Sequence, residues 1–135
     1  MTYLTKISGW GKYPQQDAQL LTPFSSRSLE AIVKHEDSFI ARGMGRRYGE
    51  SSNSPKVLQT LHIDHFIEFD EFTGKITAEA GISLREILRV IGPKGWFLPV
   101  TPGTSFVTLG GAIASDVHGK NHHVAGTLGQ HVTSL

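Results

Sequence analysis

The chain has 135 residues, a net charge of +1 and no cysteine. This length is enough for one domain with a buried core. The lack of cysteine excludes disulfides, thiolate nucleophiles and cysteine-ligated zinc. The balanced charge excludes a global field that would recruit nucleic acid or an anionic membrane, so any anion binding must be local.

The 15 glycines exceed ordinary usage and cluster at 41–49 and 103–129. Such clustering indicates loops shaped around a ligand. No apolar run approaches the ~20 residues of a membrane span, and the N-terminus lacks the apolar core of a signal peptide. We therefore expect no transmembrane segment and a cytoplasmic protein, with any attachment to a membrane or cell envelope being peripheral.

The polar stretch 1–23, with scattered aromatics and two prolines, predicts an irregular N-terminal arm. Ser25 or Ser26 can cap a helix running to about His35. Residues 38–41 predict a short buried strand that leads into the first glycine-rich loop.

Further strands are expected at 57–61, 66–69 and 75–80, with a turn at 71–74. Ser83 and Glu86 form a capping box that opens a helix, and Gly92-Pro93 ends it. The remaining expected elements are a buried strand at 95–100, a helix at 110–114 capped by Thr108, and a strand beginning at 131–135. The fold class is α+β, with mixed strands and two or three helices.

The first glycine-rich segment, 42–49, reads Arg-Gly-Met-Gly-Arg-Arg-Tyr-Gly. Its glycines permit positive φ and remove Cβ atoms, so successive N–H groups can point into one concavity that binds phosphate. Bidentate charge-assisted bonds can come from its arginines, Arg42, Arg46 and Arg47. The Rossmann and Walker spacings both fail here. The alternative is a tight surface turn with solvated arginines.

The second segment, 102–111, ends at the start of the predicted helix. Unpaired N–H groups and the helix dipole there favour an anion. The alternative for Gly110 and Gly111 is close packing between helix and strand. Two such cradles in one small chain predict that both grip the diphosphate of a single dinucleotide.

The seven histidines raise the question of a metal site. His118 and His122 have a helical i, i+4 spacing, and His62 and His65 form a second incomplete pair. Neither pair has an obvious third ligand, so no metal is expected. We expect His118 and Lys120 to donate hydrogen bonds in a polar pocket. Surface or capping roles are expected for His122, His123 and His131.

Three stretches, RGMGRRYGES, TPGT and VTLGGAIASDVHGKNHHVAGTLGQHV, together resemble one known family. This is the FAD-binding PCMH-type domain of the vanillyl-alcohol-oxidase family. The likeness covers residues 38–135 and is strongest to the decaprenylphosphoryl-β-D-ribose 2-oxidase branch. It implies that the FAD-binding domain occupies 24–135, after the predicted arm at 1–23, and that it is incomplete at its C-terminus and without the substrate domain.

The resemblance also implies site residues. His118 and Lys120 would lie on the substrate side of the flavin, as catalytic candidates. The implied cofactor-binding residues are Ala41, Arg42, Gly43, Met44, Gly45, Arg46, Arg47, Tyr48, Gly49, Glu50, Ser51, Gly103, Thr108, Leu109, Gly110, Gly111, Ser115, Asp116, Val117 and His118. Arg46 stands where relatives with covalent flavin carry a histidine, which implies FAD held without a covalent bond.

The implied activity is hydride transfer from a secondary alcohol of a sugar or glycosyl lipid to FAD. A short-chain dehydrogenase/reductase would be the partner in epimerisation, and no nucleic acid is involved. The alternatives are an aldonolactone or alditol oxidase of the same fold, and a non-catalytic FAD- or nucleotide-binding module. The 135-residue chain by itself is not expected to turn over.

Overall fold

In the computed structural model, which describes residues 2–135, the chain divides into two units, Met1–Asp64 and His65–Leu135. Each unit has its own core cluster. The first core consists of Ile7, Ala18, Leu20 and Val57. The second core consists of Ile82, Leu84, Ile87, Ile91, Val100, Ala112 and Leu128.

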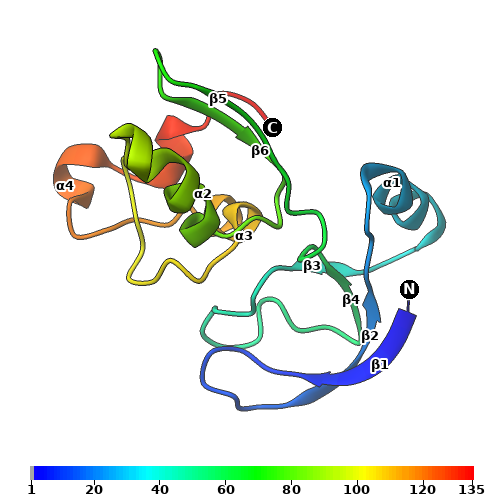
Figure 1. Cartoon of the computed structure of the whole chain (residues 1–135). Helices are drawn as coiled ribbons and strands as arrows, with labels where there is room; N and C mark the ends of the chain where they lie inside the picture. The colour runs from blue at the N-terminus through cyan, green and yellow to red at the C-terminus, as the bar shows by residue number, and fades with distance from the viewer. Residues whose placement is uncertain (1) are drawn as a thin grey trace. The chain divides into compact units, whose positions relative to one another are not determined.

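The first unit is built on a four-stranded sheet of order β1-β2-β4-β3 (Figure 1). β1 (Thr2–Ile7) pairs antiparallel with β2 (Gln16–Leu21), and β2 pairs parallel with β4 (Lys56–Gln59). The prediction of an irregular arm at 1–23 is therefore wrong. β1 is an edge strand whose first residues are exposed, so its polar composition concealed it.

Helix α1 (Ser26–His35) follows β2, and Ser25 caps it, which confirms the predicted helix and its cap. β3 (Ile40–Arg42) pairs parallel with β4 and leads into the first glycine-rich loop. The strand prediction holds, but its burial was wrong. Ile40 and Ala41 are exposed, and the residue that is buried is Arg42.

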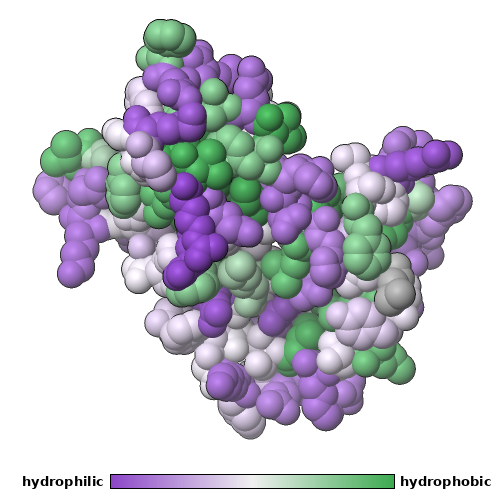
Figure 2. Space-filling view, viewed as in Figure 1, coloured by the Kyte–Doolittle hydropathy of each residue, from purple (hydrophilic) through white to green (hydrophobic). Residues whose placement is uncertain are grey.

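The second unit begins with a hairpin of β5 (Phe66–Asp70) and β6 (Lys75–Ala78), as predicted. The helical elements that follow are α2 (Leu84–Ile91), η1 (Gly92–Lys94), α3 (Leu109–Ala114), α4 (His122–Ala125) and η2 (Leu128–His131). On the face drawn in Figure 2, apolar side chains gather over α2 and the hairpin, whose half-buried residues pack against the second core.

Two predicted strands of this unit are absent. Residues 95–100 form no strand, because Gly95 takes a left-handed φ of 83° and Pro99 cannot donate to a ladder. Only Val100 of this segment is buried. At 131–135 the chain leaves η2 without regular structure, so that prediction was also wrong.

The start of α2 carries the first testable prediction. The Ser83 hydroxyl accepts from the Glu86 N–H at 3.1 Å, and the Ser83 backbone N–H donates to the Glu86 carboxylate at 3.2 Å, which completes the predicted capping box. The hydroxyl also donates to this carboxylate at 2.8 Å. Ser83→Ala is expected to lower the free energy of unfolding by about 1 kcal/mol in denaturant titrations. Ser105→Ala, at a half-buried loop position, is the control and is expected to change little.

The same box gives stability a pH dependence. The hydrogen bonds from Ser83 lower the pKa of Glu86 from its ordinary 4.5. The Glu86 carboxylate therefore stabilises the fold fully above pH 4.5, and this contribution disappears as pH falls through the lowered value. Ser83→Ala is expected to flatten this part of the pH profile. An unchanged profile would contradict the assignment.

Candidate cofactor and substrate sites

Arg42, at the end of β3, is the buried centre of the first glycine-rich loop. Its Nη1 donates to Asn53 Oδ1 at 2.8 Å and to Ser52 Oγ at 3.1 Å, and its Nη2 donates to the Ser8 carbonyl oxygen at 2.6 Å. Burial lowers the pKa of the guanidinium, which nevertheless stays charged. These contacts join both ends of the loop to the segment after β1, so we expect Arg42 to shape the cradle.

Two of the loop glycines have the conformation that was predicted. Gly45 and Gly49 take φ of 65° and 72°. At Gly45 a Cβ would also come within 2.1 Å of Arg42 Nη2, so only glycine fits beside the buried guanidinium. Gly43 does not take positive φ, so that part of the nest prediction is wrong.

The outer part of the loop borders a hollow of about 440 Å³, whose lining includes Met44, Gly45 and Arg46. Arg46, Arg47 and Tyr48 are exposed. The other wall of the hollow comes from β1 and the segment after it, which the sequence analysis did not include in the site. Gly-Trp-Gly-Lys at 9–12 is a signal that could have identified this wall.

The hollow is suited to an anionic cofactor. No carboxylate lines it, whereas Lys6, Lys12, Arg42 and Arg46 do. The buried Asn53 Nδ2, at the base of the same loop, has no hydrogen-bond partner among the residues that the structure describes. The backbone bend at Gly45 and these cations fit the diphosphate of a dinucleotide.

The second glycine-rich segment differs from its prediction. At the start of α3 the Leu109 and Gly110 N–H groups donate to the carbonyl oxygens of Ile82 and Ala80, both at 2.8 Å, and the Gly111 N–H donates to Thr108 Oγ1. The predicted unpaired amides are therefore absent at these three positions, although Thr108 does cap the helix as predicted. That 108–111 contacts the cofactor stays a prediction.

Gly110 is explained by packing. A Cβ there would lie 2.9 Å from the Cβ of Ala80 and 3.1 Å from its carbonyl oxygen. Ala80 lies in the turn after β6, so Gly110 packs closely against that turn, whereas the sequence left open an approach between helix and strand. Gly103 differs, because it is exposed and a Cβ on it would meet nothing within 4 Å.

Residues 115–118 follow α3 and are fixed by hydrogen bonds. Asp116 takes a positive φ of 44°, and its carboxylate accepts from the Gly129 N–H at 2.8 Å. Val117 is half-buried against the second core, and its carbonyl oxygen accepts from the Leu128 N–H. These residues hold the chain in place just before His118, which is exposed.

The candidate substrate residues His118 and Lys120 lie on an exposed turn around Gly119. A Cβ on Gly119 would lie 2.5 Å from the Thr101 carbonyl oxygen, so the turn sits close against the TPGT segment. Asn121 Nδ2 donates to the Pro99 carbonyl oxygen at 3.2 Å and holds the turn there. The structure therefore brings 99–101 and 118–121 together.

Three histidines of this unit, His118, His122 and His123, form a row of rings. His122 lies edge to face against both His118 and His123, each with ring centroids 5.7 Å apart. The rings of His122 and His131 also hydrogen-bond to backbone carbonyls, as capping residues do. Within residues 2–135 there is no group of three His, Asp or Glu side chains that could hold a metal ion.

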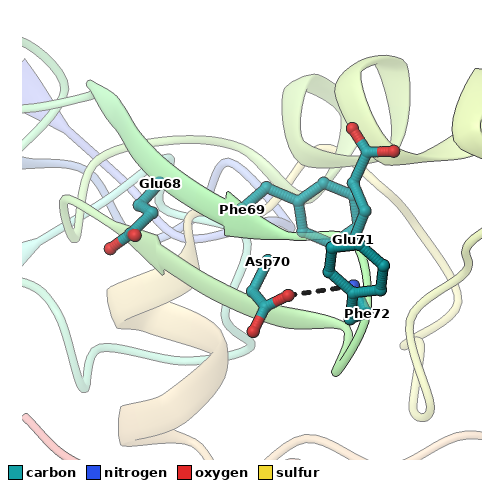
Figure 3. A pocket seen from close by; sticks show the side chains of 5 residues that line it. All are labelled: Glu68, Phe69, Asp70, Glu71 and Phe72. Atoms are coloured by element: carbon teal, nitrogen blue, oxygen red, sulfur yellow. Dashed lines mark hydrogen bonds between the residues drawn. The ribbon is translucent and has the colours of Figure 1, made fainter.

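A separate hollow, of about 600 Å³, lies beside the β5–β6 turn and contains none of the predicted site residues (Figure 3). Two of its three carboxylates, those of Asp70 and Glu71, already have partners. Asp70 accepts from the Phe72 N–H and the Thr73 hydroxyl, which lowers its pKa, and Glu71 pairs with Lys94. These contacts stabilise the turn, and a local excess of carboxylates does not fit a diphosphate.

Glycine-rich loops on a fold of mixed strands and helices place this chain in a class of proteins that bind a cofactor. Residues 21–135 match the family described as the FAD binding domain, and the chain belongs to that family. Its cofactor is FAD. One relative, decaprenylphosphoryl-beta-D-ribose oxidase of Mycolicibacterium smegmatis, is 34% identical over 141 residues, an alignment that covers 99% of this chain. L-gulonolactone oxidase 5 of Arabidopsis thaliana is 21% identical over 81% of the chain.

Solved structures agree on the fold. Cholesterol oxidase from Brevibacterium sterolicum matches 88% of this chain with a TM-score of 0.73 at 17% identity. Alkyldihydroxyacetonephosphate synthase matches 85% with a TM-score of 0.72 at 20% identity. The predicted α+β FAD-binding PCMH-type fold is confirmed. The chain spans 31% of the mycobacterial relative and about a quarter of each solved chain, 25% and 24%.

No helix in the part of the chain that the structure describes combines the length and apolarity needed to cross a bilayer. The two predicted cradles lie in different units, the first within 1–64 and the second within 65–135. That both hold one dinucleotide stays a prediction, as do the individual cofactor and substrate contacts.

Proposed function

We propose that this chain is the FAD-binding part of an oxidoreductase that oxidises a secondary alcohol of a polyprenyl-phosphoryl pentose. The observation that carries the proposal is the 34% identity to the mycobacterial decaprenylphosphoryl-ribose oxidase over 99% of this chain. The exposed turn with His118 and Lys120, held by Pro99 and packed close against Thr101, supports it, because this turn can present two donors to a hydroxyl or phosphate.

In this proposal the residues divide into two groups. Arg46 and the N–H groups of the first loop bind the diphosphate, and His118 and Lys120 orient the substrate. FAD, when bound, supplies the hydride acceptor. Lys120 donates hydrogen bonds to the substrate. The flavin is held without a covalent bond, so acid denaturation should release all of it from the polypeptide.

The test is to express the protein from its complete reading frame and record its flavin absorbance under anaerobic conditions. Addition of a polyprenyl-phosphoryl ribose is expected to bleach the flavin, whereas alditols and aldonolactones are not. A colourless folded protein would overturn the proposal. Bleaching by an aldonolactone alone would favour the second candidate, which the match to L-gulonolactone oxidase supports.

A non-catalytic module is the remaining alternative. Equal, weak binding of FAD, FMN and ATP would favour it over the enzyme. If the enzyme proposal holds, its product is a ketone that needs a reductase to complete an epimerisation. A short-chain dehydrogenase/reductase is the proposed partner for that step, and addition of one with a reduced nicotinamide should convert the ketone to the epimeric alcohol.

Gly103→Ala tests for the cofactor itself. The chain leaves open space at this position, so the variant is expected to be as stable as the wild type, or more stable by up to about 1 kcal/mol. If FAD lies against Gly103, the added methyl group should raise the dissociation constant for FAD at least tenfold, as measured by flavin fluorescence. Gly92→Ala, also in open space, is the control. Equal affinity for FAD in Gly103→Ala and Gly92→Ala would show that Gly103 is not part of the FAD site.

A further inference from the structure

The family match begins at residue 21, yet the segment Ser8–Lys12 is joined closely to the first glycine-rich loop. The Ser8 carbonyl oxygen accepts from Arg42 Nη2 at 2.6 Å, and the Trp10 N–H donates to the Arg47 carbonyl oxygen at 3.0 Å. Figure 1 shows the loop after β1 beside the loop after β3. The segment thus contacts the loop at its base and at its outer bend.

Two further close approaches strengthen the contact between this segment and the loop. Gly9 lies so close that a Cβ would be 2.5 Å from the Gly49 carbonyl oxygen and 2.7 Å from that of Arg47. The guanidinium of Arg46 lies 5.1 Å from the ring centroid of Trp10, in a cation–π arrangement. The segment therefore restricts both the backbone of the loop and the direction of its exposed arginine.

The same segment supplies positive charge to the hollow, which no carboxylate lines. Lys6 in the lining is paired with Asp17 at 2.9 Å. Lys12 and Arg46 have no carboxylate partner among residues 2–135, and both line the hollow. Lys12 takes a left-handed φ of 59°, which strains a residue that carries a side chain, and its ammonium makes no ion pair with residues 2–135 that would offset this strain.

We propose that Ser8–Lys12 is part of the FAD site: it forms one wall of the hollow, fixes the glycine-rich loop, and places the Lys12 ammonium on a phosphate of the cofactor. This rests on the FAD binding of the proposed function. The chemistry recognised is a phosphate diester or diphosphate. Inorganic pyrophosphate, ADP and FAD are therefore compared as probes in competition experiments.

Lys12→Gly separates an effect on cofactor binding from an effect on stability. The substitution should weaken FAD binding without lowering the melting temperature. Glycine relieves the left-handed strain, so the melting temperature should stay equal or rise. Loss of the ammonium should raise the dissociation constants of FAD and ADP about tenfold and reduce their dependence on salt. Lys34→Gln, which removes a cation on α1 away from the hollow, should leave them unchanged. An unchanged FAD dissociation constant for Lys12→Gly would overturn the role of Lys12.

Gly9→Ala and Gly11→Ala are a matched pair for the loop contact. A Cβ at Gly9 meets two backbone carbonyl oxygens, whereas at Gly11 it meets nothing within 4 Å. In the protein without FAD, Gly9→Ala should speed tryptic cleavage after Arg46 and Arg47 severalfold and weaken FAD binding, and Gly11→Ala should do neither. Equal cleavage and equal FAD affinity in the two variants would show that the segment does not fix the loop.

FAD binding by the wild-type protein distinguishes failure of the proposed function from failure of this inference alone. If the wild-type protein does not bind FAD, both the proposed function and this inference fail. If it binds FAD while Gly9→Ala and Lys12→Gly bind it equally well, only this inference fails. Pyrophosphate that competes with FAD in the wild type but not in Lys12→Gly would place the lysine on the diphosphate.

Discussion

Replacing Arg42 with methionine is expected to lower the free energy of unfolding by about 3 kcal/mol and to abolish FAD binding. Methionine retains an unbranched apolar stem like that of arginine but has none of the N–H donors of the guanidinium. The substitution leaves the buried Asn53 Oδ1 without its donor, and it removes the donor to the half-buried Ser8 carbonyl oxygen and to the half-buried Ser52. Because buried acceptors without donors cost far more than a lost surface contact, this is the largest single-residue effect expected in the loop.

Denaturant unfolding and flavin fluorescence measure the two effects. Arg42→Lys should recover little, because one ammonium group cannot reach both Ser8 and Asn53 as the guanidinium fork does. The control is Arg27→Met, at an exposed position on α1, with an expected change within about 0.5 kcal/mol. If Arg42→Met unfolded within that same range, the loop would not depend on its buried guanidinium.

The features predicted correctly from sequence are local ones. Ser25, Ser83 and Thr108 all cap helices where the pattern indicated, because a cap depends on a side chain and an amide within three residues. The β5–β6 hairpin was predicted for the same reason, since its turn lies between adjacent segments. Local chemistry decides these elements before tertiary contacts form.

The errors concern features that distant parts of the chain decide. β2 exists because it pairs with β1 and, in parallel, with β4, which is more than thirty residues further along. The burial of Arg42 in a strand that was expected to bury its neighbours depends on Ser8 and Asn53, which no short motif contains. Likewise, the amides of α3 were expected to be unpaired because the carbonyl oxygens of Ala80 and Ile82 cannot be placed beside them from sequence.

The structure also separates the glycines that the fold requires from those that it does not. Gly45 is required by Arg42 and Gly110 by Ala80, so neither one is by itself a sign of a ligand. Gly103 has no such neighbour and is exposed. A glycine that the chain itself does not explain is the stronger indication of a bound group, which makes Gly103 the more informative position for testing cofactor contact.

Gly119→Ala is expected to have the second largest effect, and its consequence should fall on turnover. The added Cβ would lie 2.5 Å from the Thr101 carbonyl oxygen, so the backbone of the turn must move away from the TPGT segment. His118 and Lys120 would move with it. A displacement of about 1 Å at orienting groups is enough to lower kcat about 100-fold, and we expect a cost in stability of about 1–3 kcal/mol.

Steady-state kinetics of the protein expressed from its complete reading frame, with the polyprenyl-phosphoryl ribose that we propose as substrate and well below the unfolding temperature, tests this result. FAD affinity should fall less than tenfold, because the first loop is untouched. Val124→Ala, at an exposed position on α4, is the control and should leave both kcat and stability near wild type. A Gly119→Ala protein that turned over within twofold of wild type would mean that the turn is not part of the substrate site. Only Gly119 lies between His118 and Lys120, so only its substitution should displace these two donors. An equal loss of kcat in Gly119→Ala and Val124→Ala would therefore attribute the loss to α4 and not to the two donors.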